Sequence, residues 1–157
     1  MSDSAQDGTK VWVVSIHDKA AQGYLAFDLN EILICLGDSA KDYHWLVADV
    51  ECSGEAPPTG VLMPTEELLH RAEKFVQTIS GLIVGLPNGG YSAQEVLSIS
   101  EIRQFPASRA CIAILAVDSS FFEILTKDYD HVRLLKNCFQ DVRQEDPNMH
   151  FRQPGLG

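Results

Sequence analysis

The sequence predicts an α+β fold, a single domain in which about three helices pack on a mixed or mostly antiparallel sheet of five to six strands. An uninterrupted apolar run at 110–117, followed by turn residues and a strand-like segment at 121–127, predicts a buried hairpin. An apolar helical stripe over 129–141, preceded by Asp128 as an N-cap, predicts a helix directly after it. The order of the elements lacks the regular strand–helix alternation of a doubly wound sheet.

The first elements are a strand at 10–17 and a helix at 29–36. The strand is indicated by its β-branched and aromatic residues. The helix is indicated at both ends, because Asp28 and Glu31 have capping-box spacing and Gly37 stands where a helix commonly terminates. A strand over the short apolar run 31–36 is the alternative.

A second strand is predicted at 43–52, and its alternation defines two faces. One face carries Tyr43, Trp45, Val47, Asp49 and Glu51. The other carries His44, Leu46, Ala48, Val50 and Cys52, and it is the more apolar toward its end. We therefore expect the second face to line the core, and Trp45 with the two carboxylates to face solvent or a partner.

The remaining elements follow from turn signals and periodicity. A proline- and glycine-rich loop is expected at 53–64, a helix at 66–77 capped by Thr65, and a buried strand at 81–86. The segment 91–105 allows a short helix to Leu97 and an edge strand at 98–105. We expect residues 1–9 to be a disordered lead-in, 10–144 to form the α+β domain and 145–157 to form a tail.

The chain is acidic, with a net charge of −10 over 157 residues. This field repels phosphate backbones, so nucleic-acid binding is not expected. Solubility is the simplest explanation of the charge, and a basic protein is the kind of partner that it would favour. No apolar run is long enough for a membrane span, and the polar, acidic start differs from a secretory signal. We therefore expect a cytoplasmic protein. A monomer and a homodimer are both compatible with the sequence.

The four cysteines lie in apolar segments without paired spacing, which favours reduced, packed thiols. They are Cys35, Cys52, Cys111 and Cys138. Cys52, at the end of its strand, is the best candidate among them for a reactive thiol, although packing is the favoured role. The five histidines lack the spacing of zinc ligands, so no metal or cofactor is expected.

Two sequence features could carry binding or chemistry. The glycine-rich turn at 85–91 precedes a possible helix start, as in anion-binding loops, but it lacks the residues of a phosphate motif. Asp49 and Glu51 lie two residues apart on a strand, roughly 6–7 Å from one another, a distance that suits acid–base chemistry or Mg²⁺. A solvated acidic strand face is the favoured interpretation of these two carboxylates. The alternative is a binding site for a protein partner, formed by Asp49, Glu51 and Trp45 on the same face.

The segment 108–139 contains Asp118-Ser-Ser-Phe-Phe-Glu-Ile-Leu-Thr-Lys-Asp and then an amphipathic helix, and it resembles a pattern in small uncharacterised bacterial proteins. In size, acidity and its Trp-bearing second strand, the chain is similar to immunity proteins of bacterial toxin systems. This resemblance implies a bacterial, cytosolic, non-enzymatic protein and transfers no functional residues. The leading hypothesis is thus a protein-binding module, and the alternative is a small enzyme or ligand-binding domain that uses Asp49 and Glu51 or the 85–91 turn.

Overall fold

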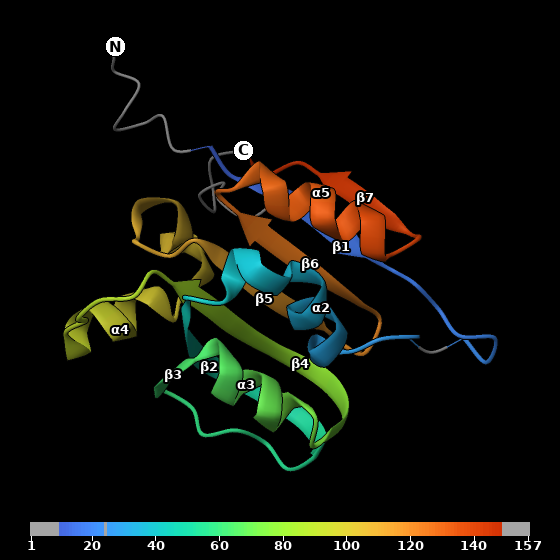
Figure 1. Cartoon of the computed structure of the whole chain (residues 1–157), viewed down its shortest axis with the longest axis horizontal. Coiled ribbons are helices and arrows are strands. Elements are labelled where there is room, and N and C mark those ends of the chain that lie inside the picture. Colours follow the sequence, from blue (N-terminus) through green and yellow to red (C-terminus); the bar gives the residue numbers. More distant parts are fainter. Residues whose placement is uncertain (1–9, 24, 149–157) are drawn as a thin grey trace, which may run out of the picture.

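The computed structural model describes residues 10–23 and 25–148, and its centre is one seven-stranded sheet of order β3-β2-β4-β5-β6-β1-β7 (Figure 1). Every pairing among these strands is antiparallel. The α+β class is confirmed, and the sheet is larger than the five to six strands expected. The strands are β1 (Trp12–Ile16), β2 (His44–Gly54), β3 (Leu62–Pro64), β4 (Phe75–Leu86), β5 (Ile112–Val117), β6 (Phe121–Thr126) and β7 (Val142–Glu145).

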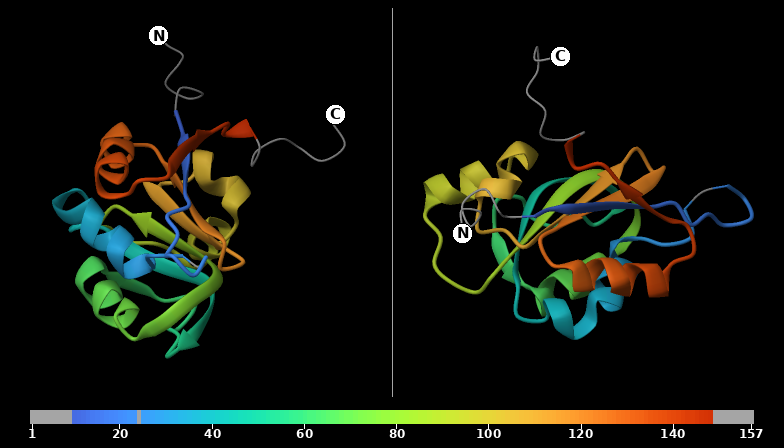
Figure 2. Two further views of the ribbon diagram at one scale, coloured as in Figure 1. Left: turned by 90° about the vertical axis from the view of Figure 1, so that its right-hand side faces the viewer. Right: turned by 90° about the horizontal axis from the view of Figure 1, so that it is seen from above.

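Helical segments cover both faces of the sheet (Figure 2). One face carries α2 (Leu29–Leu36), α3 (Thr65–Ala72) and α5 (Tyr129–Cys138), and the 3-10 turn η1 (Gly37–Ala40) follows α2. The other face carries α4 (Ala93–Ile99) and the 3-10 segment η2 (Ile102–Ala107). The sheet is therefore the middle layer, with a buried cluster of apolar side chains on each side.

Helix α2 has the bounds that its end signals predict. The Asp28 carboxylate accepts a hydrogen bond from Leu29 N, and Glu31 Oε1 accepts one from Asp28 N at 2.7 Å, which completes the capping box. Gly37 ends the helix with φ +53°, a conformation that side chains with a Cβ rarely adopt. Local chemistry thus sets both ends of α2.

The hairpin of β5 and β6 is also confirmed. Its turn residues Asp118 and Ser119 have φ values of 48° and 59°, which match the primed turns that suit twisted strands. Ser119 N donates to Ile79 O at 2.7 Å, so the turn is also tied to strand β4.

Three expected boundaries were wrong. The helix predicted at 66–77 ends at Ala72, because the chain from Phe75 onward pairs with β2 and forms the start of the long strand β4. The predicted loop at 53–64 contains β3, which pairs with β2 in the register His44 to Pro64. The helix predicted to reach residue 141 ends at Cys138, and the unpredicted strand β7, which pairs with β1, follows it and takes in Glu145, the first residue of the expected tail.

The alternative of an edge strand at 98–105 was also wrong. The expected short helix forms as α4, whose N-cap Ser92 accepts a hydrogen bond from Glu95 N at 3.1 Å, and η2 occupies the second half of the segment expected as a strand. Phe105 is buried against the second face of the sheet. Residues 1–9 and 149–157, predicted as a lead-in and as most of the tail, lie outside the described residues.

Candidate functional site

Trp45 lies in the core and not on a solvent face. Its side chain is 0% exposed, and its Nε1 donates to Thr65 Oγ1 at 2.7 Å. Thr65 Oγ1 in turn donates to Ala40 O at 2.6 Å. The expectation that Trp45 faces solvent or a partner beside Asp49 and Glu51 was wrong, because the indole packs under the helices of the first face.

A β-bulge separates Trp45 from the two carboxylates. Val47 pairs with Ile83 and Asp49 pairs with the next residue, Leu82, so one extra residue of β2 interrupts the alternation at Ala48. Directly paired residues share a face of the sheet, so Asp49 lies on the opposite face from Val47 and Trp45. Asp49 and Glu51 keep a common face beyond the bulge, and both are exposed.

A shallow groove lies beside Asp49 on this second face. Its volume is about 330 Å³, and Leu82 and Leu115, which pair directly across β4 and β5, form its apolar part. Asp49 and the turn residue Asp118, both exposed, supply carboxylates at the groove. The full lining is Asp49, Ser80, Gly81, Leu82, Leu115, Ala116, Val117 and Asp118. Among these described residues none carries a positive charge.

Glu51 extends the acidic surface along β2. It pairs with Ser80, whose hydroxyl donates to Glu51 Oε1 at 3.4 Å. The groove thus combines an apolar floor with carboxylates from β2 and from the hairpin turn. Sequence reasoning found Asp49 and Glu51 but missed Asp118, Leu82 and Leu115, because only the order of three strands brings them together.

The turn at 85–91 is occupied by the chain's own side chains. The Arg109 guanidinium lies 4.1 Å from the Tyr91 ring, donates to Gly90 O at 2.7 Å and forms two hydrogen bonds with the Glu95 carboxylate. The Arg109 side chain holds the pKa of Glu95 below its ordinary value. The Glu95 and Val96 amides at the start of α4 are bound by Ser92. This arrangement presents a carboxylate where an anion cradle would present free N–H groups.

A larger cavity of about 520 Å³ lies between α2, α3 and the start of β4. Its lining includes Asp28, Asn30, Glu31, Glu73 and Thr78. The side-chain oxygens Asn30 Oδ1 and Thr78 Oγ1 are buried and have no hydrogen-bond partner among the described residues. Buried polar atoms of this kind are normally completed by water or a ligand.

A buried histidine links the last helix to the sheet. His131 is 0% exposed, its Nδ1 lies 2.6 Å from Thr126 Oγ1, and its Nε2 lies 3.3 Å from the Tyr43 hydroxyl. Burial lowers the pKa of His131, and the nearby Asp128 carboxylate only partly opposes this effect. Burial also raises the pKa of the neighbouring Cys111 thiol, which disfavours the reactive thiolate.

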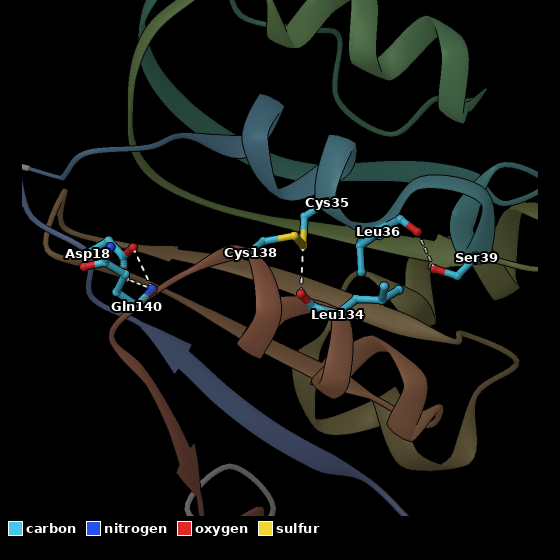
Figure 3. Close-up of a disulfide and its surroundings, with 7 residues drawn as sticks. All are labelled: Asp18, Cys35, Leu36, Ser39, Leu134, Cys138 and Gln140. Carbon is cyan, nitrogen blue, oxygen red and sulfur yellow. Dashed lines mark hydrogen bonds between the residues drawn. A yellow bond between two sulfur atoms is a disulfide. The ribbon is translucent and has the colours of Figure 1, made fainter.

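The cysteines correct the sequence-based expectation of four reduced thiols. Cys35 and Cys138 form a disulfide across the C-terminal ends of α2 and α5, with their Cα atoms 6.1 Å apart (Figure 3). The two residues are 103 positions apart, so no spacing pattern could reveal the pair. Cys52 and Cys111 are free thiols, and burial raises the pKa of Cys52 as well.

Within residues 10–23 and 25–148, no group of three or more His, Cys, Asp or Glu residues is placed to hold a metal ion. None of the described helices has the length and apolarity needed to cross a membrane.

The fold and the groove define a class, an antiparallel α+β protein with an acidic, partly apolar groove on one face of its sheet. Comparison of the chain with protein-family models, with curated proteins and with solved structures found no match.

Proposed function

We propose that the chain is a non-enzymatic protein-binding module that recognises a basic partner through its acidic surface. The observation that carries the proposal is the groove beside Asp49, where carboxylates border an apolar floor of Leu82 and Leu115. Lysine and arginine side chains have this same division, since an apolar stem ends in a cation. Such a side chain would lay its stem on the floor and place its charge beside Asp49 and Asp118.

The charge of the whole chain supports the same kind of partner. A net charge of −10 attracts basic proteins before contact, so electrostatic steering accelerates association. Salt screens this attraction, so association should slow as the salt concentration rises. The resemblance to immunity proteins is consistent with this proposal. The proposal places the chain in the cytoplasm, as a monomer or a homodimer.

The test compares two pairs of charge reversals with equal change of net charge. Asp49→Lys with Glu51→Lys alters the groove and the acidic surface next to it on β2, and Asp38→Lys with Asp42→Lys alters exposed positions elsewhere. The probe is a capped peptide rich in lysine and leucine, and its affinity is measured by titration at two salt concentrations. We expect the groove pair to weaken binding at least about tenfold and the control pair to weaken it much less.

An equal loss of affinity in both pairs would contradict the proposal, because net charge alone would then explain binding. ¹⁵N chemical shifts locate the peptide independently. The proposal requires the largest shifts at Leu82, Leu115 and Asp118, and shifts confined to another surface would overturn it.

A second candidate function is small-ligand binding in the 520 Å³ cavity. The unpartnered oxygens of Asn30 and Thr78 favour it, and the carboxylates of Asp28, Glu31 and Glu73 select a cationic ligand. Methylguanidinium is a suitable probe, and its binding is measured through the ¹⁵N chemical shifts of Asn30 and Thr78. Shifts in these residues that Asn30→Ala abolishes would support this function, and an unchanged spectrum would exclude it for this class of ligand.

A further inference from the structure

The disulfide between Cys35 and Cys138 is asymmetric in its exposure. Cys138, the last residue of α5, is exposed, whereas Cys35 on α2 is half-buried. Cys35 Sγ also lies 3.2 Å from the carbonyl oxygen of Leu134, as Figure 3 shows. A disulfide sulfur carries no hydrogen, so this contact becomes a hydrogen bond only when Cys35 is a thiol. The surroundings of Cys35 therefore suit the reduced form as well as the bonded one.

We propose that Cys35 and Cys138 form a reversible thiol–disulfide exchange site, which clamps α2 to α5 when oxidised and releases them when reduced. The reductant that fits the site is a dithiol. This inference is independent of the basic partner proposed above.

The exchange begins at the exposed sulfur. One thiolate of the dithiol attacks Cys138 Sγ, a new S–S bond forms there, and the Cys35–Cys138 bond breaks. The electron pair goes to Cys35 Sγ, which takes a proton and donates the resulting S–H to Leu134 O. The second thiolate of the reductant then attacks the reductant's first sulfur, which is bonded to Cys138 in the mixed disulfide. This attack releases Cys138, which takes a second proton. The site has gained two electrons and two protons, and the dithiol has become a disulfide.

A dithiol is required because Cys35 remains next to Cys138 in the mixed disulfide. Its high effective concentration favours closure of the original bond when the attacking molecule has one thiol. A second thiol in the reductant competes with this closure within the same molecule. Burial raises the pKa of both Cys52 and Cys111, which disfavours the thiolate form that either would need to attack the disulfide.

The fold contains enough other contacts to survive opening of the bond. Helix α2 buries Leu29, Ile32, Leu33 and Leu36 against the core, and α5 buries His131, Val132 and Leu135. The chain after Cys138 is held separately, because the Asp18 carboxylate accepts a hydrogen bond from Gln140 N at 2.9 Å, drawn in Figure 3. The same carboxylate accepts a second hydrogen bond from Asp141 N at 2.6 Å. Reduction thus frees the clamp without removing the anchors on either side of it.

The experiment uses the full chain with Cys52→Ser and Cys111→Ser, so that only the pair can react. The oxidised protein is treated with dithiothreitol or with 2-mercaptoethanol at equal thiol concentration, trapped with N-ethylmaleimide and weighed by mass spectrometry. We expect no label before reduction, two labels after dithiothreitol and far fewer after the monothiol. Far-UV circular dichroism should keep its native shape, while amide exchange in the last turns of α2 and α5 accelerates at least about tenfold.

Three results would overturn the inference. Labelling of Cys35 and Cys138 before reduction would show that the bond does not form. Reduction that needs denaturant would show a permanent crosslink, and loss of the native spectrum on reduction would show that the fold depends on the bond. The same assay on the chain with all four natural cysteines excludes an effect of the two serine substitutions.

Discussion

The side chain of Asp28 accepts a hydrogen bond from the backbone N–H of Thr78 at 2.9 Å, across 50 residues of sequence. Its other oxygen accepts from Leu29 N at 2.8 Å, at the start of α2. One carboxylate therefore caps a helix and holds that helix to strand β4. The residue that the sequence marks as a local cap is also a tertiary link.

Replacing Asp28 should separate these two roles. Asp28→Ala removes the cap and leaves the Thr78 N–H without its acceptor, so we expect a loss of about 2–4 kcal/mol in the free energy of unfolding. Asp28→Ser keeps a capping oxygen but cannot serve both donors, and it should lose roughly half as much. Urea unfolding measures both. Equal losses in the two variants would show that the cap contributes nothing, and a stability of Asp28→Ser equal to that of the parent would show that the Thr78 bond contributes nothing.

Two glycines should respond differently to alanine. A Cβ on Gly85 would lie 2.7 Å from Ile112 Cγ2 and 2.9 Å from Trp45 Cζ3, whereas nothing lies within 4 Å of one on Gly90. Gly85→Ala should destabilise the protein by about 1–3 kcal/mol through overpacking. Gly90→Ala is the matched control and should stay within about 0.5 kcal/mol of the parent. Thermal or urea unfolding distinguishes the two, and equal stabilities would contradict the tight approach of β4 to Trp45.

The burial of Trp45 should be visible in fluorescence. Trp12→Phe leaves Trp45 as the reporter, and its fully buried indole should emit at shorter wavelength and resist acrylamide quenching. Trp45→Phe leaves the partly exposed Trp12, which should be quenched more easily. The reverse order of quenching would restore the expectation that Trp45 faces solvent.

His131 should make stability depend on pH. Burial lowers its pKa in the folded protein below the ordinary 6.5, so the unfolded chain binds the proton more readily. The free energy of unfolding should therefore fall as the pH falls below about 6.5, by no more than about 1.4 kcal/mol per pH unit for one proton. The decline ends near the folded pKa, below which both states bind the proton.

Urea unfolding at several pH values between 8 and 5 measures this slope. His17, whose pKa burial also lowers, adds a contribution of the same sign. His131→Gln should flatten the dependence, and His17→Gln is the matched control that should leave most of it. A slope unchanged in His131→Gln would assign the effect to other groups.

The disulfide should contribute to stability only while it is oxidised. Cys35→Ser with Cys138→Ser should lower the free energy of unfolding by about 2–5 kcal/mol without reductant, because the bond closes a long loop across 103 positions. With excess dithiothreitol, the variant and the parent should differ by much less. A large difference that persists under reduction would attribute the loss to packing of the thiols.

Elements with signals in adjacent residues were predictable from the sequence. Helix α2 follows from Asp28, Glu31 and Gly37, and the β5–β6 hairpin follows from an apolar run with turn residues. Boundaries that depend on pairing were not predictable. The segment from Phe75 continues a helical apolar pattern, yet it becomes strand because β2 is long enough to pair with it.

Only part of the candidate groove was predictable from the sequence, because its other residues come together through strand pairing. Asp49 and Glu51 share a face because they lie two residues apart within one strand. The face itself depends on the bulge at Ala48, which the partner strand creates when Val47 and Asp49 pair with consecutive residues of β4. Strict alternation through the bulge placed Trp45 wrongly beside the two carboxylates.

The sequence by itself determined the α+β class, the acidity, the two ends of α2 and the hairpin, because each depends on composition or on residues a few positions apart. Tertiary structure alone decided the burial of Trp45 and the Cys35–Cys138 bond. It also decided that Asp49, Leu115 and Asp118 line one groove. These features join segments far apart in the chain. Their geometry depends on strand order, on a register shift and on helix packing, none of which leaves a local pattern.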